Sequence, residues 1–149
     1  GPAELIKAMA KVQSQTTSNP CSIRQEAATE ALNGSQDPIE ENNKLFKDRR
    51  DIIHEKINQI DGLSCLKPNG AFYLFISCEE LIGRSTPDGK IIENDSDLIL
   101  HLLDDALVAA VPGVAFGIKN YFRISYATST EILLEACHRI KKSCDKLKK

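Results

Sequence analysis

The sequence predicts an α+β fold in which helices pack on a small, mostly antiparallel sheet. Three observations predict it. Apolar residues recur at helical spacing in several long stretches, short apolar runs with strand character lie between these stretches, and 149 residues suffice for one domain with a buried core. The composition agrees, because 42% of the residues are hydrophobic and 27% are charged. No internal repeat or long linker divides the chain, so we expect a single domain over residues 1–149.

Three helices are expected in the N-terminal part of the chain, over residues 2–15, 22–32 and 38–60. The third has the strongest signals, since Asp37 can cap it and Pro38 suits the first helical position. Its apolar face combines four residues at helical spacing: Phe46, Ile53, Ile57 and Ile60.

Beyond residue 60 the pattern changes to short strands with turns between them. We expect strands over 63–66, 71–77, 108–111 and 121–126. The segment 78–95 contains glycine and proline turn signals and is interpreted as an exposed loop.

Two further helices complete the expected fold. One covers 95–106, with Leu98, Ile99, Leu102 and Leu103 directed inward. The other follows a capping box formed by Thr128 and Glu131. Its apolar stripe consists of Leu133, Cys137, Ile140, Cys144 and Leu147.

Charge and cysteine content exclude several function classes. The net charge is −2, without the basic surface that nucleic-acid binding needs. No apolar run is long enough for a transmembrane helix, and the sequence shows no charged-then-apolar N-terminal export signal, so a cytoplasmic protein is expected. Five cysteines, an odd number without C-x-x-C spacing, argue against a disulfide framework and a zinc site. We expect reduced, buried thiols and no bound metal.

Arg123 is the residue most suggestive of chemistry. In an extended strand it shares one face with Tyr121 and Ser125, whereas Phe122 and Ile124 point to the other face. A guanidinium in the middle of an apolar strand suits a carboxylate held by two parallel hydrogen bonds. The alternative is an ordinary arginine on a solvated face, which the spacing alone does not exclude.

Five segments in order resemble the C-terminal part of class I/II pyridoxal-phosphate (PLP) aminotransferases, most closely the bacterial aspartate aminotransferase group. They are Gly1–Ile6, Gln13–Gln15, Pro68–Tyr73, Val111–Gly117 and Tyr121–Ala127. The resemblance covers essentially the whole chain. It implies the small-domain fold of fold-type I PLP enzymes over residues 34–149, with residues 1–33 as a helical segment that follows the cofactor domain.

The resemblance also implies two substrate-binding residues. Arg123 matches the family's arginine that holds the α-carboxylate of the amino-acid substrate. Phe72 matches an aromatic residue that lines the substrate pocket, with ordinary strand packing as the alternative.

The family's Ser-x-x-Lys, whose lysine carries the cofactor, is absent from the chain. We therefore expect a truncated C-terminal fragment of a cytoplasmic, homodimeric transaminase of amino-acid metabolism. The parent would use PLP and act on amino acids and 2-oxo acids, of the aspartate/2-oxoglutarate type. The fragment itself is expected to be inactive, with no catalytic residue, no cofactor-binding residue and no bound cofactor. The alternatives are a non-catalytic module that binds a carboxylate or a protein, and a fragment of another fold-type I PLP enzyme.

Overall fold

The computed structural model describes all 149 residues. They divide into two compact units, Gly1–Ile39 and Glu40–Lys149, which are described separately. The expected single domain over 1–149, with a helical segment over 1–33, stays a prediction.

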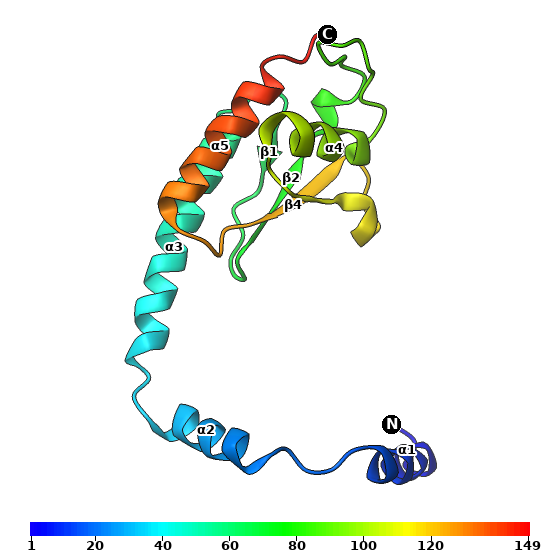
Figure 1. Cartoon of the computed structure of the whole chain (residues 1–149), viewed down its shortest axis with the longest axis vertical. Helices are drawn as coiled ribbons and strands as arrows, with labels where there is room; N and C mark the ends of the chain where they lie inside the picture. The colour runs from blue at the N-terminus through cyan, green and yellow to red at the C-terminus, as the bar shows by residue number, and fades with distance from the viewer. The chain divides into compact units, whose positions relative to one another are not determined.

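The first unit contains two helices, α1 (Ala3–Thr16) and α2 (Ser22–Asn33), and the start of α3 (Figure 1). The segment between α1 and α2 contains Asn19-Pro20, and proline disfavours a helical conformation in the residue before it. Neither helix buries a residue. The large apolar side chains of α1 are exposed, and they are Leu5, Ile6, Met9 and Val12.

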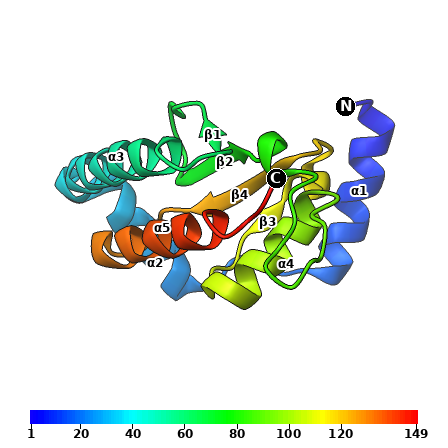
Figure 2. The ribbon, with the colours of Figure 1, turned by 90° about the horizontal axis from the view of Figure 1, so that it is seen from above.

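Helices α3 (Asp37–Asn58), α4 (Asp95–Ala106) and α5 (Thr130–Cys144) supply most of the helical side of the core in the second unit. The C-terminal half of α3 lies beside α5, and Figure 2 shows the three helices grouped around the strands. The residues they bury follow the helical spacing seen in the sequence. They include Ile53, Ile57, Leu98, Ile99, Leu102, Leu133, Cys137, Ile140 and Cys144.

The four strands form one antiparallel sheet in the order β1-β2-β4-β3, which confirms the expected fold class. Their bounds are Ser64–Cys65, Tyr73–Ser77, Val111–Pro112 and Tyr121–Ser125 for β1 to β4. Strands β2 and β4 form the centre, with Phe75 opposite Arg123. Three of the strands begin later than expected, β1 by one residue, β2 by two and β3 by three. Ala71 has a φ of 60°, which is incompatible with a strand, so β2 begins at Tyr73.

The two faces of the sheet differ in burial. Leu74, Ile76 and Phe122 are fully buried in the core beneath the helices. Tyr73, Phe75, Tyr121 and Arg123 alternate with them and are half-buried on the other face. The alternation expected around Arg123 is therefore confirmed, and it places the arginine on the face away from the core.

The segment 78–95 is not the exposed loop that its turn signals indicated. Leu81 and Ile92 have no exposed surface, and a short 3₁₀ helix, η1, spans Glu79–Leu81. The buried Arg84 forms an ion pair with Asp61 at 2.9 Å between Nη2 and Oδ2. Glycine and proline mark where the chain turns, but the apolar residues between the turns decide its burial.

Two further expectations are wrong in detail. Leu103 is 44% exposed instead of directed inward, because the buried face of α4 is narrower than the apolar stripe. The cap of α5 is Ser129, whose side chain accepts a hydrogen bond from the backbone N–H of Ile132, and not Thr128. Adjacent hydroxyl residues are both suitable caps, and only the backbone path selects one of them.

All five cysteines are free. Cys78, Cys137 and Cys144 are buried, as expected, whereas Cys65 is half-buried and Cys21 is exposed. None of the helices combines the length and apolar composition that crossing a bilayer requires.

Candidate functional site

Arg123 lies at the centre of β4, between two neighbouring strands. In the ladder it is opposite Phe75 of β2 on one side and opposite Val111 of β3 on the other. Its side chain is half-buried on the face of the sheet that the helices do not cover. A flexible, charged side chain therefore emerges from the most firmly paired part of the sheet.

Two aromatic rings contact the Arg123 guanidinium. Its Cζ lies 4.1 Å from the ring centroid of Tyr73 and 4.5 Å from that of Phe116. Both distances are well within the range of a cation–π interaction. These contacts hold the charged group against apolar surface instead of leaving it in open solvent.

No protein carboxylate or carbonyl accepts a hydrogen bond from the Arg123 side chain. Other arginines of the chain have such partners: Arg84 pairs with Asp61, and Arg50 pairs with Asp51 at 2.8 Å. Arg123 thus forms no internal ion pair of the kind that would indicate a structural role. The guanidinium retains its donors for an acceptor from outside the unit.

The position of Phe116 depends on a tight turn. Phe116 ends the 3₁₀ helix η2 (Gly113–Phe116), and the buried Asp95 accepts a hydrogen bond from the Val114 N–H at 3.1 Å. A Cβ atom on Gly113 would lie 2.5 Å from the carbonyl oxygen of Ile118, so only glycine fits there. The turn that brings Phe116 to Arg123 is therefore closely packed.

Sequence reasoning missed Tyr73 and Phe116 as neighbours of Arg123. Tyr73 pairs with Ser125 in the ladder, and is thus the diagonal neighbour of Arg123 within reach of a long side chain. That relation would follow from the sequence only with the strand register known. No sequence signal places Phe116, because it lies outside the strands.

Phe72 lies directly before β2 and is 42% exposed. Its ring centroid is 4.7 Å from that of Tyr73 and 6.2 Å from that of Phe46 on α3. Tyr126 holds this turn, because its hydroxyl donates to the Ala71 carbonyl at 2.8 Å and its N–H donates to the Phe72 carbonyl at 2.9 Å. Phe72 therefore contacts Tyr73, and Tyr73 in turn contacts the Arg123 guanidinium. Phe72 also packs against α3.

Two of the three histidines have structural partners, whereas His138 is exposed on α5. His54 Nε2 lies 3.0 Å from the Cys65 carbonyl oxygen, and His101 Nε2 lies 3.1 Å from the Ser143 hydroxyl. No group of histidine, cysteine and carboxylate side chains is arranged to hold a metal ion. Arg123 and its aromatic neighbours thus remain the candidate site of this chain.

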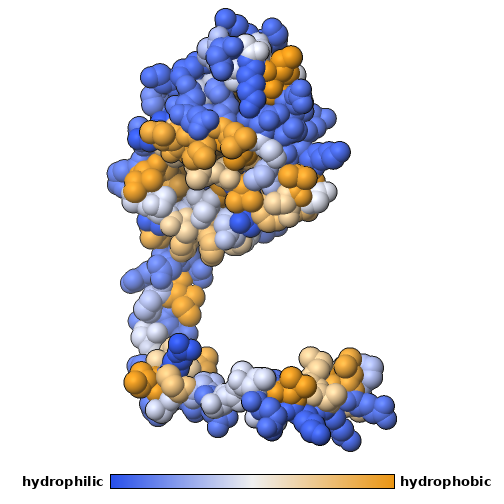
Figure 3. All heavy atoms as spheres, turned by 45° about the vertical axis from the view of Figure 1, so that its right-hand side comes forward, coloured by the Kyte–Doolittle hydropathy of each residue, from blue (hydrophilic) through white to orange (hydrophobic).

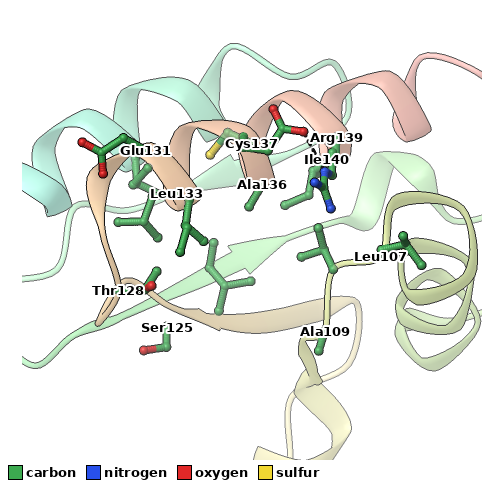
Figure 4. A pocket seen from close by; sticks show the side chains of 15 residues that line it. Leu107, Ala109, Ser125, Thr128, Glu131, Leu133, Ala136, Cys137, Arg139 and Ile140 are labelled. Carbon is green, nitrogen blue, oxygen red and sulfur yellow. Dashed lines mark hydrogen bonds and ion pairs between the residues drawn. The ribbon is translucent and has the colours of Figure 1, made fainter.

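A hollow with a volume of about 520 Å³ lies between α5 and the segment after α4 (Figure 4). Its wall is largely apolar, and Leu133, Ala136 and Ile140 line it from α5. The ion pair of Arg139 with Glu135 at 2.8 Å stands at its edge. Glu131 adds a carboxylate without an ion pair to this lining, and the otherwise apolar wall of this groove offers a surface for packing.

The comparisons with known proteins agree with the fold. The family model described as aminotransferase class I and II matches residues 1–140. The chain belongs to this family.

Individual relatives make the likeness more specific. The chain is 53% identical over 144 residues to a probable aspartate/prephenate aminotransferase of Rickettsia felis, covering 97% of the chain and 35% of that protein. It is 54% identical to an aspartate aminotransferase of Rhizobium meliloti, covering 99% of the chain and 36% of that protein. The chain thus spans about a third of the length of these curated relatives.

Solved structures give the same result. The crystal structure of the Rhizobium meliloti aspartate aminotransferase superposes with a TM-score of 0.92, at 54% identity, over 99% of this chain and 37% of that one. An alanine aminotransferase of Pyrococcus furiosus superposes with a TM-score of 0.79, at 33% identity, over 95% and 33%. The expected likeness to the small domain of fold-type I PLP enzymes is confirmed at the level of fold.

The lysines of this chain do not fit the attachment of PLP. Twelve of the thirteen are exposed, and the half-buried Lys146 is held by Asp105, with Nζ 2.6 and 2.8 Å from the two carboxylate oxygens. A cofactor lysine needs an enclosed position beside the bound ring. None of the lysines of this chain occupies such a position.

Proposed function

We propose that this chain supplies the substrate-carboxylate-binding part of a PLP-dependent aminotransferase. The parent would transfer an amino group between an amino acid and a 2-oxo acid, of the aspartate/2-oxoglutarate type. One observation carries the proposal: the half-buried Arg123 guanidinium has aromatic contacts and no protein acceptor. Membership of the aminotransferase family and the names of the relatives support it.

Arg123 would bind the α-carboxylate through two parallel N–H···O bonds, because its planar fork matches the two oxygens. Such a grip fixes the orientation of the substrate as well as its position. Phe72 would line the same pocket from the turn before β2. PLP would act as the electron sink of the reaction, held by a part of the parent protein outside this chain.

The decisive experiment uses a chimera in which this chain replaces its counterpart in the Rhizobium meliloti enzyme. We expect Arg123→Ala to raise KM for aspartate by about 10- to 100-fold, since a charge-assisted hydrogen-bonded pair contributes roughly 1.5–3 kcal/mol. Arg139→Ala is the control, because that exposed arginine pairs only with Glu135 on its own helix. Unchanged KM and kcat in Arg123→Ala would refute the proposed role.

A second experiment addresses the cofactor. After incubation of the chain with PLP and reduction by borohydride, we expect no lysine to be labelled stoichiometrically. Specific labelling of a single lysine would contradict the assignment of PLP binding to another part of the parent.

In the parent gene, a Ser-x-x-Lys should be encoded within a few tens of residues before Gly1.

We further propose that the parent is a cytoplasmic homodimer. Five free thiols suit a reducing compartment. The exposed apolar side of α1 would need a cover in the assembled enzyme. The alternative, an independent non-catalytic module, would bind carboxylates through the same arginine but would lend no activity to the chimera.

A further inference from the structure

The contacts that hold the Arg123 guanidinium in place differ from the hydrogen bonds that it can donate to a ligand. An arginine that is fixed by a carboxylate uses its N–H donors to stay in place. The ring faces of Tyr73 and Phe116 attract the positive charge at 4.1 and 4.5 Å but accept no conventional hydrogen bond. Arg123 is thus held in position while its donors stay available.

The two rings come from elements that are fixed independently of Arg123. Tyr73 belongs to β2 and is paired with Ser125 of β4. Phe116 belongs to the turn that Asp95 and Gly113 hold, and its ring also meets the edge of Phe75 at 5.9 Å and 83°. A guanidinium that approaches these rings therefore enters a prepared position, which lowers the entropy lost when a ligand binds.

We propose that Tyr73 and Phe116 are positioning residues, an aromatic clamp that holds the Arg123 guanidinium ready for a substrate carboxylate. The inference rests on the proposed function of Arg123. It deepens that function, because it assigns the orientation of the guanidinium to two rings and not to a charged partner. A ligand then gains the full charge-assisted pair without first displacing a protein carboxylate.

The clamp has a spectroscopic signature in the free chain. A guanidinium that lies over aromatic rings experiences their ring currents, so we expect the Nε–Hε proton of Arg123 to resonate upfield of the other arginine Nε–Hε protons. Tyr73→Leu and Phe116→Leu should each reduce this shift, whereas Tyr73→Phe should retain it. Tyr121→Leu is the matched control, because the Tyr121 ring stacks on Phe75 and makes no cation–π interaction with Arg123. Backbone amide spectra report whether each variant is folded.

Titration with succinate, a simple dicarboxylate, tests the consequence for binding. We expect Tyr73→Leu and Phe116→Leu to raise the dissociation constant for succinate about five- to tenfold. This factor corresponds to the free energy of a partly desolvated cation–π contact. Tyr73→Phe and Tyr121→Leu should stay within about twofold of the wild type. If Tyr73 only stabilised the fold, the Arg123 Nε–Hε resonance would not differ between the Tyr73→Leu and Tyr73→Phe variants.

The outcomes distinguish the two proposals. If Arg123→Ala binds succinate as well as the wild type, or the wild type does not bind it, the proposed function fails and the clamp with it. If Arg123→Ala abolishes binding while folded Tyr73→Leu and Phe116→Leu variants keep wild-type affinity, the clamp alone is overturned. An Arg123 Nε–Hε resonance without an upfield shift would also overturn it.

Discussion

At the residue scale, burial decides which thiols of this chain can react. Burial raises the pKa of Cys137 to about 11, and that of Cys78 and Cys144 to about 12. A thiol attacks only as the thiolate, so these three groups stay inert near neutral pH. Cys21 is exposed on the chain before α2.

We therefore expect an aromatic disulfide reagent at pH 8 to modify Cys21 rapidly in the folded chain. The three buried thiols should react only after denaturant is added. Peptide mapping after a short pulse identifies the modified residue. Fast labelling of Cys78 or Cys144 under native conditions would show that their surroundings open far more readily than the packed core indicates.

A second residue-scale prediction concerns the tie between α4 and the end of the chain. The hydrogen bonds from Lys146 and then from Ser143 lower the pKa of the Asp105 carboxyl below its ordinary value of 3.8. A carboxyl with a lowered pKa in the folded state stabilises the fold above its unfolded-state pKa. This contribution is lost as the pH falls through the folded-state value.

Lys146→Met should lower the free energy of unfolding at pH 7 by about 0.5–1 kcal/mol, because the pair is partly exposed. The difference from the wild type should shrink as the pH falls from the ordinary value of 3.8 through the lower pKa at which Asp105 takes up a proton in the folded chain. Urea titrations across this pH range measure both values. Lys142→Met, which removes an exposed lysine without an ion pair, serves as the control and should show neither effect.

At the element scale, the start of α5 depends on one hydroxyl group. The Ser129 side chain accepts a hydrogen bond from the Ile132 N–H at 3.3 Å and satisfies one of the free donors of the first turn. The neighbouring Thr128 is half-buried at the edge of the apolar groove and caps nothing. The two residues are chemically similar, so comparing them isolates the cap.

Ser129→Ala should destabilise the chain by about 0.5–2 kcal/mol, the usual cost of losing an N-terminal cap. Thr128→Ala should cost clearly less. Urea unfolding monitored by far-UV circular dichroism provides both free energies. Equal losses, or a larger loss at Thr128, would mean that the helix begins one residue earlier than the structure places it.

At the scale of the whole molecule, exposed apolar surface is the property with the widest consequence. Orange side chains gather on the second unit and along the first in Figure 3. On the second unit, Leu107 and Ile132 beside the groove are 74% and 59% exposed. On α1, Val12 is 65% exposed. Apolar patches of this kind promote association in water.

We expect the isolated chain to self-associate, with a sedimentation-derived mass that rises above the 16.5 kDa monomer as concentration increases. The double variant Leu107→Glu/Ile132→Glu should reduce this association, since it places charges beside the groove. A constant monomer mass across a hundredfold range of concentration would show that these surfaces do not associate.

Local sequence signals determined the elements and the family likeness of this chain. The apolar spacing of Ile53, Ile57 and Ile60, and the alternation around Arg123, depend only on neighbouring residues. The type and approximate bounds of each helix were therefore predictable. The same alternation set Arg123 apart from the core face of its strand before its surroundings were known.

The tertiary structure alone decided what surrounds Arg123. Tyr73 lies fifty residues earlier in the chain, and it reaches the guanidinium only through the register in which Phe75 pairs with Arg123. Phe116 reaches it through a turn that close packing around Gly113 enforces. The burial of Leu81 and Ile92 between turn signals has the same origin. Contacts between distant segments depend on strand pairing and on how the whole core fills, and no local pattern carries that information.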